Sequence, residues 1–295
     1  MQREDKIILK DSEGKAIEVT RDEYRRLLFI EVDKNRENAE QLFYIGHAFL
    51  NDQFNEEAME VFKLATAIDP QNMMYDNAIG VCYLQMQQYE KAKEFFLGHV
   101  KRFPNSALGY LNSAKASDYL HQIEEVEKYL RRSIELNPNL YNSLLYWLLY
   151  CKDYDKLDMG IEFLISIAEQ GEGNWGPYLI LALEFEERGD KSLSLQYADK
   201  ALMCNIDNGC AFADLATLYA KLGEINKSIE ILEAKALKEE LSFKEIWNLA
   251  VAYYETGNFK KAGKEIEKLE NMVDDDESRA LIRELKEFWE GGHNV

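Results

Sequence analysis

Hydrophobic and polar positions along the chain recur every 34 residues from Ala39 onward. The first half of each unit has a mostly small residue at its eighth position and a mostly aromatic one three places later. Apolar residues three or four places apart share one face of a helix, so this spacing predicts an amphipathic helix. The eighth residues are Gly46, Gly80, Ala114, Leu148, Ala182, Ala216 and Ala250, and the eleventh are Phe49, Tyr83, Ser117, Cys151, Phe185, Tyr219 and Tyr253.

The second half of each unit repeats the alternation of small and large residues. This half therefore predicts a second amphipathic helix, and a small residue on each helix lets the two backbones approach closely. The large residue one turn away fills the space beside the crossing. The twentieth residues are Ala58, Ala92, Val126, Gly160, Ser194, Ser228 and Ala262, and the twenty-fourth are Phe62, Phe96, Leu130, Leu164, Ala198, Leu232 and Ile266.

Three prolines, Pro70, Pro104 and Pro138, close the first three units at intervals of 34 residues. A period of 34 residues is typical of arrays of paired helices, in which each unit packs on its neighbours. Counting from Ala39 gives seven units without an insertion: 39–72, 73–106, 107–140, 141–174, 175–208, 209–242 and 243–276.

In this pattern of small, aromatic and closing proline residues the chain resembles the tetratricopeptide repeat family over residues 39–276, about four-fifths of its length. The second unit fits best, with Ile79, Gly80 and the residues around Phe96 at the family positions. Units three and four depart most, and the closing proline is missing from the last four units, where Glu172, Ile206, Glu240 and Asp274 stand instead. The resemblance implies an all-α superhelix, or solenoid, of about seven helix-turn-helix repeats.

The segments on either side of the repeats differ from them. In residues 1–38, two short apolar runs flank Asp11–Gly14 and predict a β-hairpin, and Thr20 with Glu23 predicts the capping box of a helix that caps the first repeat. In residues 277–295, an apolar stripe that begins at Leu281 predicts a C-terminal capping helix followed by a tail. We therefore expect three segments, 1–38, 39–276 and 277–295.

Composition supports a helical array and narrows the class of partner. Hydrophobic residues make up 46% of the chain, and it has only 4 prolines and 16 glycines in 295 residues, which argues against a β-rich fold. The formal net charge is −19 and the basic residues do not cluster, so we expect no nucleic-acid partner. The acidic residues are best explained as solvated helix faces, and Asp274–Glu277 as the acidic first turn of the last helix.

The N-terminus and the cysteines indicate the compartment. The first residues contain no apolar signal segment, and no window reaches the roughly 18 apolar residues that would span a bilayer, so we expect a cytoplasmic protein that does not enter a membrane. Cys82, Cys151, Cys204 and Cys210 form no CxxC pair and no cluster with histidine, which predicts free thiols and neither a metal nor a cofactor.

Residues suited to catalysis are scattered. The four histidines do not converge: His99 occupies a packing position, His121 a turn and His293 the tail, while only His47 lies on an inner helix face. No phosphate-binding, zinc-protease or nucleophile-elbow motif occurs. We therefore expect a protein that is not an enzyme, and keep a cryptic enzyme or enzyme regulator as the weakest alternative.

The resemblance implies that the first helix of each repeat lines a concave groove with its second, fifth, sixth, ninth and twelfth residues. Phe43 and His47 stand where some members hold a carboxylate with Lys and Asn, so that clamp is not expected. Apolar residues would instead accept side chains of a partner, with Asn fixing the register of its backbone and Lys supplying positive charge. The predicted groove residues are Phe43, His47, Asn77, Val81, Leu111, Asn112, Lys115, Leu145, Tyr146, Leu149, Lys152, Leu179 and Leu183.

The first helix of the fourth unit, around Leu144–Tyr150, is apolar on every side. Leu144, Trp147 and Leu148 are assigned to the repeat core, which leaves four apolar residues, Leu145, Tyr146, Leu149 and Tyr150, without a neighbour inside the chain. Such a patch often marks an interface. Three explanations stay open: a protein or peptide partner, self-association into a homo-oligomer through this face or the hairpin, and cover by the chain itself. We expect a protein-interaction scaffold first and a self-associating structural protein second.

Overall fold

A computed structural model describes residues 6–10, 16–273 and 276–291. Within them the chain folds into a short hairpin and sixteen helices in consecutive pairs, so the predicted all-α repeat fold is confirmed. The chain divides into two compact units, Met1–Asn137 and Pro138–Val295, and the boundary falls just before the end of the third repeat, residues 107–140. The division into segments 1–38, 39–276 and 277–295 stays a prediction.

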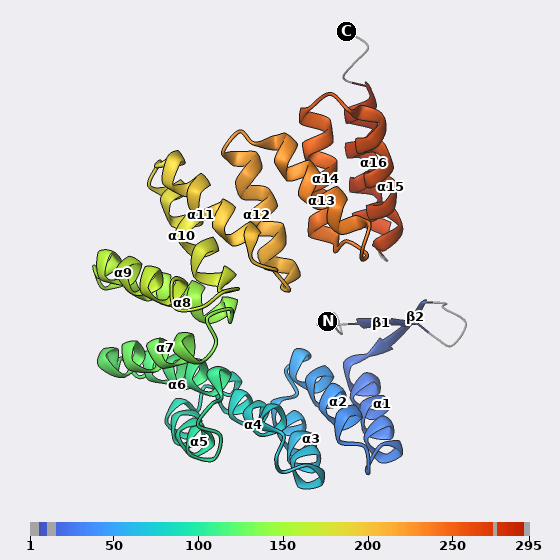
Figure 1. Ribbon diagram of the computed structural model, residues 1–295. Helices are drawn as coiled ribbons and strands as arrows, with labels where there is room; N and C mark the ends of the chain where they lie inside the picture. The colour runs from blue at the N-terminus through green and yellow to red at the C-terminus, as the bar shows by residue number, and fades with distance from the viewer. Residues whose placement is uncertain (1–5, 11–15, 274–275, 292–295) are drawn as a thin grey trace. The chain divides into compact units, whose positions relative to one another are not determined.

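The first compact unit holds the hairpin and seven helices of the described chain (Figure 1). Within this unit, each helix packs against the helix that follows it in the chain, as α2 does against α3 and α3 against α4. The elements are β1 (Lys6–Lys10), β2 (Ala16–Thr20), α1 (Arg21–Lys34), α2 (Ala39–Asn51), α3 (Asn55–Ile68), α4 (Met73–Gln85), α5 (Tyr89–Arg102), α6 (Ala107–Tyr119) and α7 (Ile123–Leu136).

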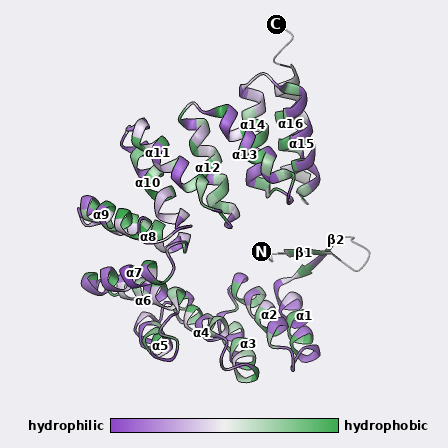
Figure 2. Ribbon diagram, viewed as in Figure 1, coloured by the Kyte–Doolittle hydropathy of each residue, from purple (hydrophilic) through white to green (hydrophobic). Residues whose placement is uncertain are grey.

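The second compact unit contains nine helices in the described residues. Helices in both units mix hydrophobic and hydrophilic residues along their length, as amphipathic helices do (Figure 2). The elements are α8 (Tyr141–Asp153), α9 (Leu157–Ala168), α10 (Trp175–Glu187), α11 (Lys191–Met203), α12 (Gly209–Lys221), α13 (Ile225–Ala236), α14 (Phe243–Glu255), α15 (Phe259–Met272) and α16 (Asp276–Gly291).

Helix starts follow the sequence period. The first helix of every repeat begins at the first residue of the 34-residue unit, from Ala39 to Phe243, and the second helix begins at the seventeenth, from Asn55 to Phe259. Asparagine or serine caps open several first helices: the side chain of Asn38 accepts a hydrogen bond from the Gln41 amide. The same local signals therefore recur at the same place in each unit.

The turn between the two helices of a repeat places its fifteenth residue in the left-handed backbone region. Four of these residues are not glycine, Gln53, Gln87, His121 and Asp155, with φ between 53° and 62°. In the last three repeats the position is Gly189, Gly223 and Gly257. Only glycine adopts this conformation without a steric penalty, so the backbone is strained at this turn in the first four repeats.

Helix crossings within a repeat are as close as the small residues predict. A Cβ atom on Gly46 would lie 2.5 Å from Cε1 of Phe62, and one on Gly80 would collide with the ring of Phe96. Phe62 and Phe96 are themselves fully buried. A larger side chain at either glycine would therefore force the two helices apart.

Both ends of the described repeats are covered by further elements. Leu28 and Val32 of α1 belong to the same buried cluster as Leu42 and Phe49 of α2, and Thr20 and Glu23 form the predicted capping box. Strands β1 and β2 pair antiparallel with Lys6 opposite Thr20. The predicted hairpin turn, which includes Gly14, lies outside the described residues.

The last helix, α16, packs on α15 and contributes Ile282 to a buried cluster with Leu269. The ring of Trp289 stacks on Tyr254 with centroids 4.6 Å apart. Leu281 is instead exposed, so it lies outside the buried stripe to which the sequence assigned it. Of the predicted acidic first turn, Asp274 and Asp275 lie outside the described residues, and the helix begins at Asp276.

Candidate functional site

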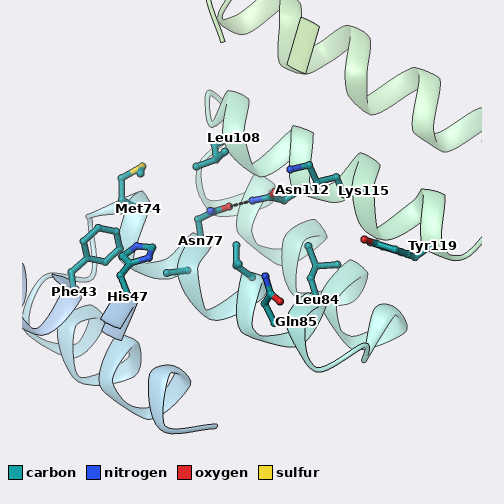
Figure 3. A pocket seen from close by; sticks show the side chains of 12 residues that line it. Phe43, His47, Met74, Asn77, Leu84, Gln85, Leu108, Asn112, Lys115 and Tyr119 are labelled. Atoms are coloured by element: carbon teal, nitrogen blue, oxygen red, sulfur yellow. Dashed lines mark hydrogen bonds between the residues drawn. The ribbon is translucent and has the colours of Figure 1, made fainter. Parts of the chain in front are cut away.

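A cavity of about 370 Å³ lies in the first compact unit, on one side of α2, α4 and α6. These are the first helices of three consecutive repeats, and their inner-face side chains point into a common space (Figure 3). Six of the thirteen predicted groove residues line this cavity. The twelve lining residues are Phe43, His47, Met74, Asn77, Ala78, Val81, Leu84, Gln85, Leu108, Asn112, Lys115 and Tyr119.

Two asparagines join neighbouring repeats at the floor of the cavity. Nδ2 of Asn112 donates a hydrogen bond to Oδ1 of Asn77 over 3.1 Å, and both side chains are buried (Figure 3). This bond uses one N–H of Asn112 and one lone pair of the Asn77 oxygen, so both amides keep further donor and acceptor capacity, which suits the backbone of an extended peptide. The pair therefore fixes α4 against α6 and keeps hydrogen-bonding capacity at the cavity.

Lys115 is half-buried one helical turn beyond Asn112 on α6. Burial lowers the pKa of its amine below the usual value, and no carboxylate acts on it to offset that effect. Removing an ammonium from water without a partner is unfavourable. The cavity therefore contains a cation that its own repeat leaves unneutralised.

Aromatic side chains form the other end of the cavity. The Phe43 ring meets the His47 ring edge-on with centroids 4.5 Å apart, and it also packs on Tyr75 at 5.0 Å. Burial lowers the pKa of His47, so at neutral pH this imidazole is mostly uncharged. Phe43 and His47 thus offer an apolar and polarisable wall, while Lys115 supplies the charge.

Several predicted groove residues lie in the second compact unit and do not share this cavity. On α8, Leu145 is 37% exposed and Leu149 is 56% exposed, while Tyr146 is half-buried. Lys152 forms ion pairs with Glu184 at 2.9 Å and Glu187 at 2.6 Å. Its charge is therefore already neutralised within the unit.

The remaining predicted residues correct the sequence analysis. Leu111 and Leu179 are fully buried, because the fifth position of their helices turns into the packing between helices, and neither can contact a ligand. Leu183 is half-buried. The prediction that Tyr150 lacks an internal neighbour is also wrong: it is buried, stacks on Trp147 at 5.9 Å, and accepts a hydrogen bond from Lys156.

Sequence reasoning missed a buried polar network beside the cavity. Nδ1 of His99 lies 2.6 Å from Oδ2 of Asp76, and Nε2 lies 2.9 Å from Oγ of Ser106, while Arg102 also pairs with Asp76. The Ser106 hydroxyl accepts a hydrogen bond from the Gly109 amide and caps α6.

The hydrogen bonds connect a carboxylate, an imidazole and a hydroxyl in the order found in a catalytic triad, but the hydroxyl is not accessible to a substrate. Ser106 and His99 are buried, and neither lines the cavity. Their contacts instead join α4, α5 and the start of α6. The matching signal in the sequence is the polar His99 at a packing position of the second repeat, which requires polar partners once it is buried.

No group of three or more His, Cys, Asp and Glu residues in the described part of the chain is arranged to hold a metal ion. No helix within the described ranges is long and apolar enough to cross a membrane.

The chain is similar to tetratricopeptide repeat proteins over part of its length. The sequence profile of the tetratricopeptide repeat matches residues 78–106, which span most of α4 and α5. A TPR repeat-containing protein of Methanocaldococcus jannaschii is 50% identical over 56 residues, which are 19% of this chain and 18% of that protein. The crystal structure of yeast Tom70 superposes with a TM-score of 0.64 at 14% identity, covering 93% of this chain and 59% of Tom70.

Proposed function

Because the chain is a tetratricopeptide repeat protein, we propose that it is an interaction scaffold whose cavity on α2, α4 and α6 binds an extended peptide or protein segment. The cavity volume of about 370 Å³ suits a few peptide side chains. Apolar walls around Phe43 and Val81 would accept those side chains, and the Asn77–Asn112 pair would hold the peptide backbone. The observation that carries the proposal is that apolar walls and a hydrogen-bonding asparagine pair line the same cavity.

The proposal extends to the setting in which the scaffold works. We infer a cytoplasmic protein without catalytic activity of its own. The four cysteines support a reducing compartment, because all of them are free thiols. The buried Ser106 supports a scaffold rather than a hydrolase, since substrate could not reach its hydroxyl.

A peptide selection tests the proposal without knowledge of the natural partner. The purified full chain is used to select binders from random 12-residue peptides displayed on phage, and the enriched peptides are synthesised for binding measurements. Gln85→Trp puts a bulky side chain at the exposed rim of the cavity, and Gln41→Trp makes the same change at an exposed position of α2 outside it. We expect Gln85→Trp to abolish binding and Gln41→Trp to preserve it.

Either of two results would refute a binding site here. The unmodified chain could enrich no peptide, or the enriched peptides could bind the Gln85→Trp variant as tightly as the unmodified protein. Circular dichroism of both variants checks that the helices are intact, since both substitutions lie on exposed helical positions.

Self-association is a second candidate, supported by the α8 face. Leu145 and Leu149 stand four residues apart on one side of the helix, and both are exposed, so they form an apolar patch. On β1 and β2, Ile8 and Ile17 are exposed as well. Light scattering of the full chain at rising concentration tests this candidate: a dimer that Leu149→Glu converts to monomer supports it, and a strict monomer excludes it.

A further inference from the structure

We propose that the cavity on α2, α4 and α6 recognises an aspartate or glutamate side chain of the bound segment, whose carboxylate pairs with the amine of Lys115. The inference rests on the proposed peptide-binding function and names the chemistry of the partner. It follows from the distribution of charge, from the pairing of the other lysines and from the course of the cavity.

The charge of this cavity is opposite to that of the chain. Although 54 of the 295 residues are Asp or Glu, none of the twelve cavity residues is acidic, and Lys115 is among them. Four other hollows of the described surface each include at least one glutamate: Glu239 and Glu240, Glu169 and Glu172, Glu94, and Glu255. A binding site that excludes carboxylates from its own lining is suited to receive one.

Half-buried lysines elsewhere in the described residues have internal partners. Five pair with carboxylates: Lys93 with Glu125, Lys152 with Glu184, Lys227 with Asp199, Lys235 with Glu245, and Lys286 with Glu267. Two more contact tyrosines, Lys156 at Tyr150 and Lys200 at Tyr197. Within the described part of the chain, Lys115 differs from them, because neither a carboxylate nor an aromatic ring lies within interaction distance of its amine.

An incoming carboxylate would satisfy this amine where the protein leaves it unpaired. Lys115 follows Asn112 by three residues, so both side chains emerge on the same face of α6 (Figure 3). A bound segment could therefore place its carboxylate on Lys115 and its adjacent peptide group on the Asn77–Asn112 pair. Because the site is partly shielded from water, this ion pair would be stronger than one on the open surface.

The carboxylate is assigned to a side chain rather than to a chain terminus because the cavity continues on both sides of Lys115. Leu108 and Asn112 precede it along α6, and Tyr119 follows one turn later, and all of them line the hollow. A peptide chain can thus pass Lys115 in both directions. On the Phe43 side the walls are apolar, so the same segment would place an apolar residue there.

The phage selection described above provides the test, with Lys115→Met beside the unmodified chain. Methionine keeps most of the length of the side chain and removes the charge, and a half-buried position tolerates it. Lys101→Met, at an exposed position of α5 outside the cavity, is the matched control. The displayed peptides have no free carboxyl terminus, so an enriched acidic residue must act through its side chain.

We expect the unmodified protein and Lys101→Met to enrich Asp or Glu at one peptide position, and Lys115→Met to lose that preference while still enriching apolar residues. In a synthetic peptide, replacing that Glu by Gln should weaken binding to the unmodified protein about tenfold and leave binding to Lys115→Met unchanged.

Four results would overturn the inference. Peptides enriched without any acidic preference, or an acidic preference retained by Lys115→Met, would refute the role of Lys115 while leaving the proposed function standing. Binding by synthetic peptides that depends on a free terminal carboxylate, and not on the Glu side chain, would assign the cation to a chain end. An empty selection by the unmodified protein would refute the proposed function itself, and this inference with it.

Discussion

The ring of Phe96 on α5 occupies the space in which a side chain at Gly80 of α4 would lie. The two residues come from the two helices of one repeat, and the ring is fully buried. The contact lets the helix backbones approach to a distance that only a residue without Cβ permits. Gly46 and Phe62 make the same contact one repeat earlier.

Replacing Gly80 with leucine tests this close crossing. We expect the free energy of unfolding to fall by about 1–3 kcal/mol, because the larger side chain must displace a buried ring. The measurement is urea-induced unfolding followed by circular dichroism. Gly98→Ala on α5 is the control: a Cβ there meets nothing within 4 Å, so the gain in helix propensity should raise stability by up to about 1 kcal/mol.

The left-handed turn residues predict opposite effects in different repeats. Gln87→Gly should stabilise the protein by about 1 kcal/mol, because glycine adopts a φ of 57° without the penalty that glutamine pays. Gly223→Ala should destabilise it by a similar amount: its φ is 89°, and no atom lies near its Cβ position. Thermal unfolding of both variants checks the pair, and a gain from Gly223→Ala would contradict the strain argument.

Acid should weaken the network around Asp76. Burial raises the pKa of this carboxyl, but hydrogen bonds from His99 and Arg102 and the charge of Arg102 outweigh burial, so its pKa in the fold lies below the usual value. A carboxyl whose pKa is lowered by folding stabilises the protein fully above the unfolded pKa of about 4. That contribution is lost as the pH falls through the lower folded-state value.

We therefore expect Asp76→Asn to cost about 3 kcal/mol at pH 7, since it leaves buried partners uncompensated. The difference in unfolding free energy between the two proteins should shrink as the pH falls below about 4. Urea titrations at a series of pH values measure this difference. If this difference in unfolding free energy stayed constant from pH 7 to pH 3, the charge of the Asp76 carboxylate would contribute nothing to stability.

The period in the sequence predicted the repeat fold well, because each helix start depends on local features that recur. Asn38 caps one helix through its own side chain, and the Gly80 contact is formed within one repeat. Such signals need no knowledge of distant segments. The left-handed turn at Gln87 escaped prediction, since glutamine gives no sign of a positive φ.

The candidate site was harder to predict because exposure depends on how neighbouring repeats pack. Leu111 and Asn77 hold the same position in adjacent repeats, yet Leu111 is fully buried away from the cavity and Asn77 lines it. Tyr150 is apolar enough to suggest an interface, but Trp147 and Tyr154 cover it. The unpaired amine of Lys115 could be recognised only once the positions of the carboxylates were known.

Thiol reactivity should follow the packing of the four cysteines. Cys210 is exposed and Cys204 is half-buried, whereas Cys82 and Cys151 are fully buried. Burial raises the pKa of Cys82 to about 12, so its reactive thiolate is scarce as well as shielded. Iodoacetamide at pH 8 should therefore label Cys210 first and Cys204 more slowly, and reach the two buried thiols only in denaturant.

The labelling reaction is stopped at successive times and each sample is digested, so that mass spectrometry of the peptides measures the labelling rate of each cysteine. Cys210→Ser should remove the fastest phase of labelling and leave the other three rates unchanged. Cys82 lies on α4, two residues after Gly80. Gly80→Leu should therefore speed the labelling of Cys82 in native buffer, because moving α4 away from α5 opens this part of the core. Labelling of Cys82 at the rate of Cys210 in the unmodified protein would contradict the packing of α4 against its neighbours.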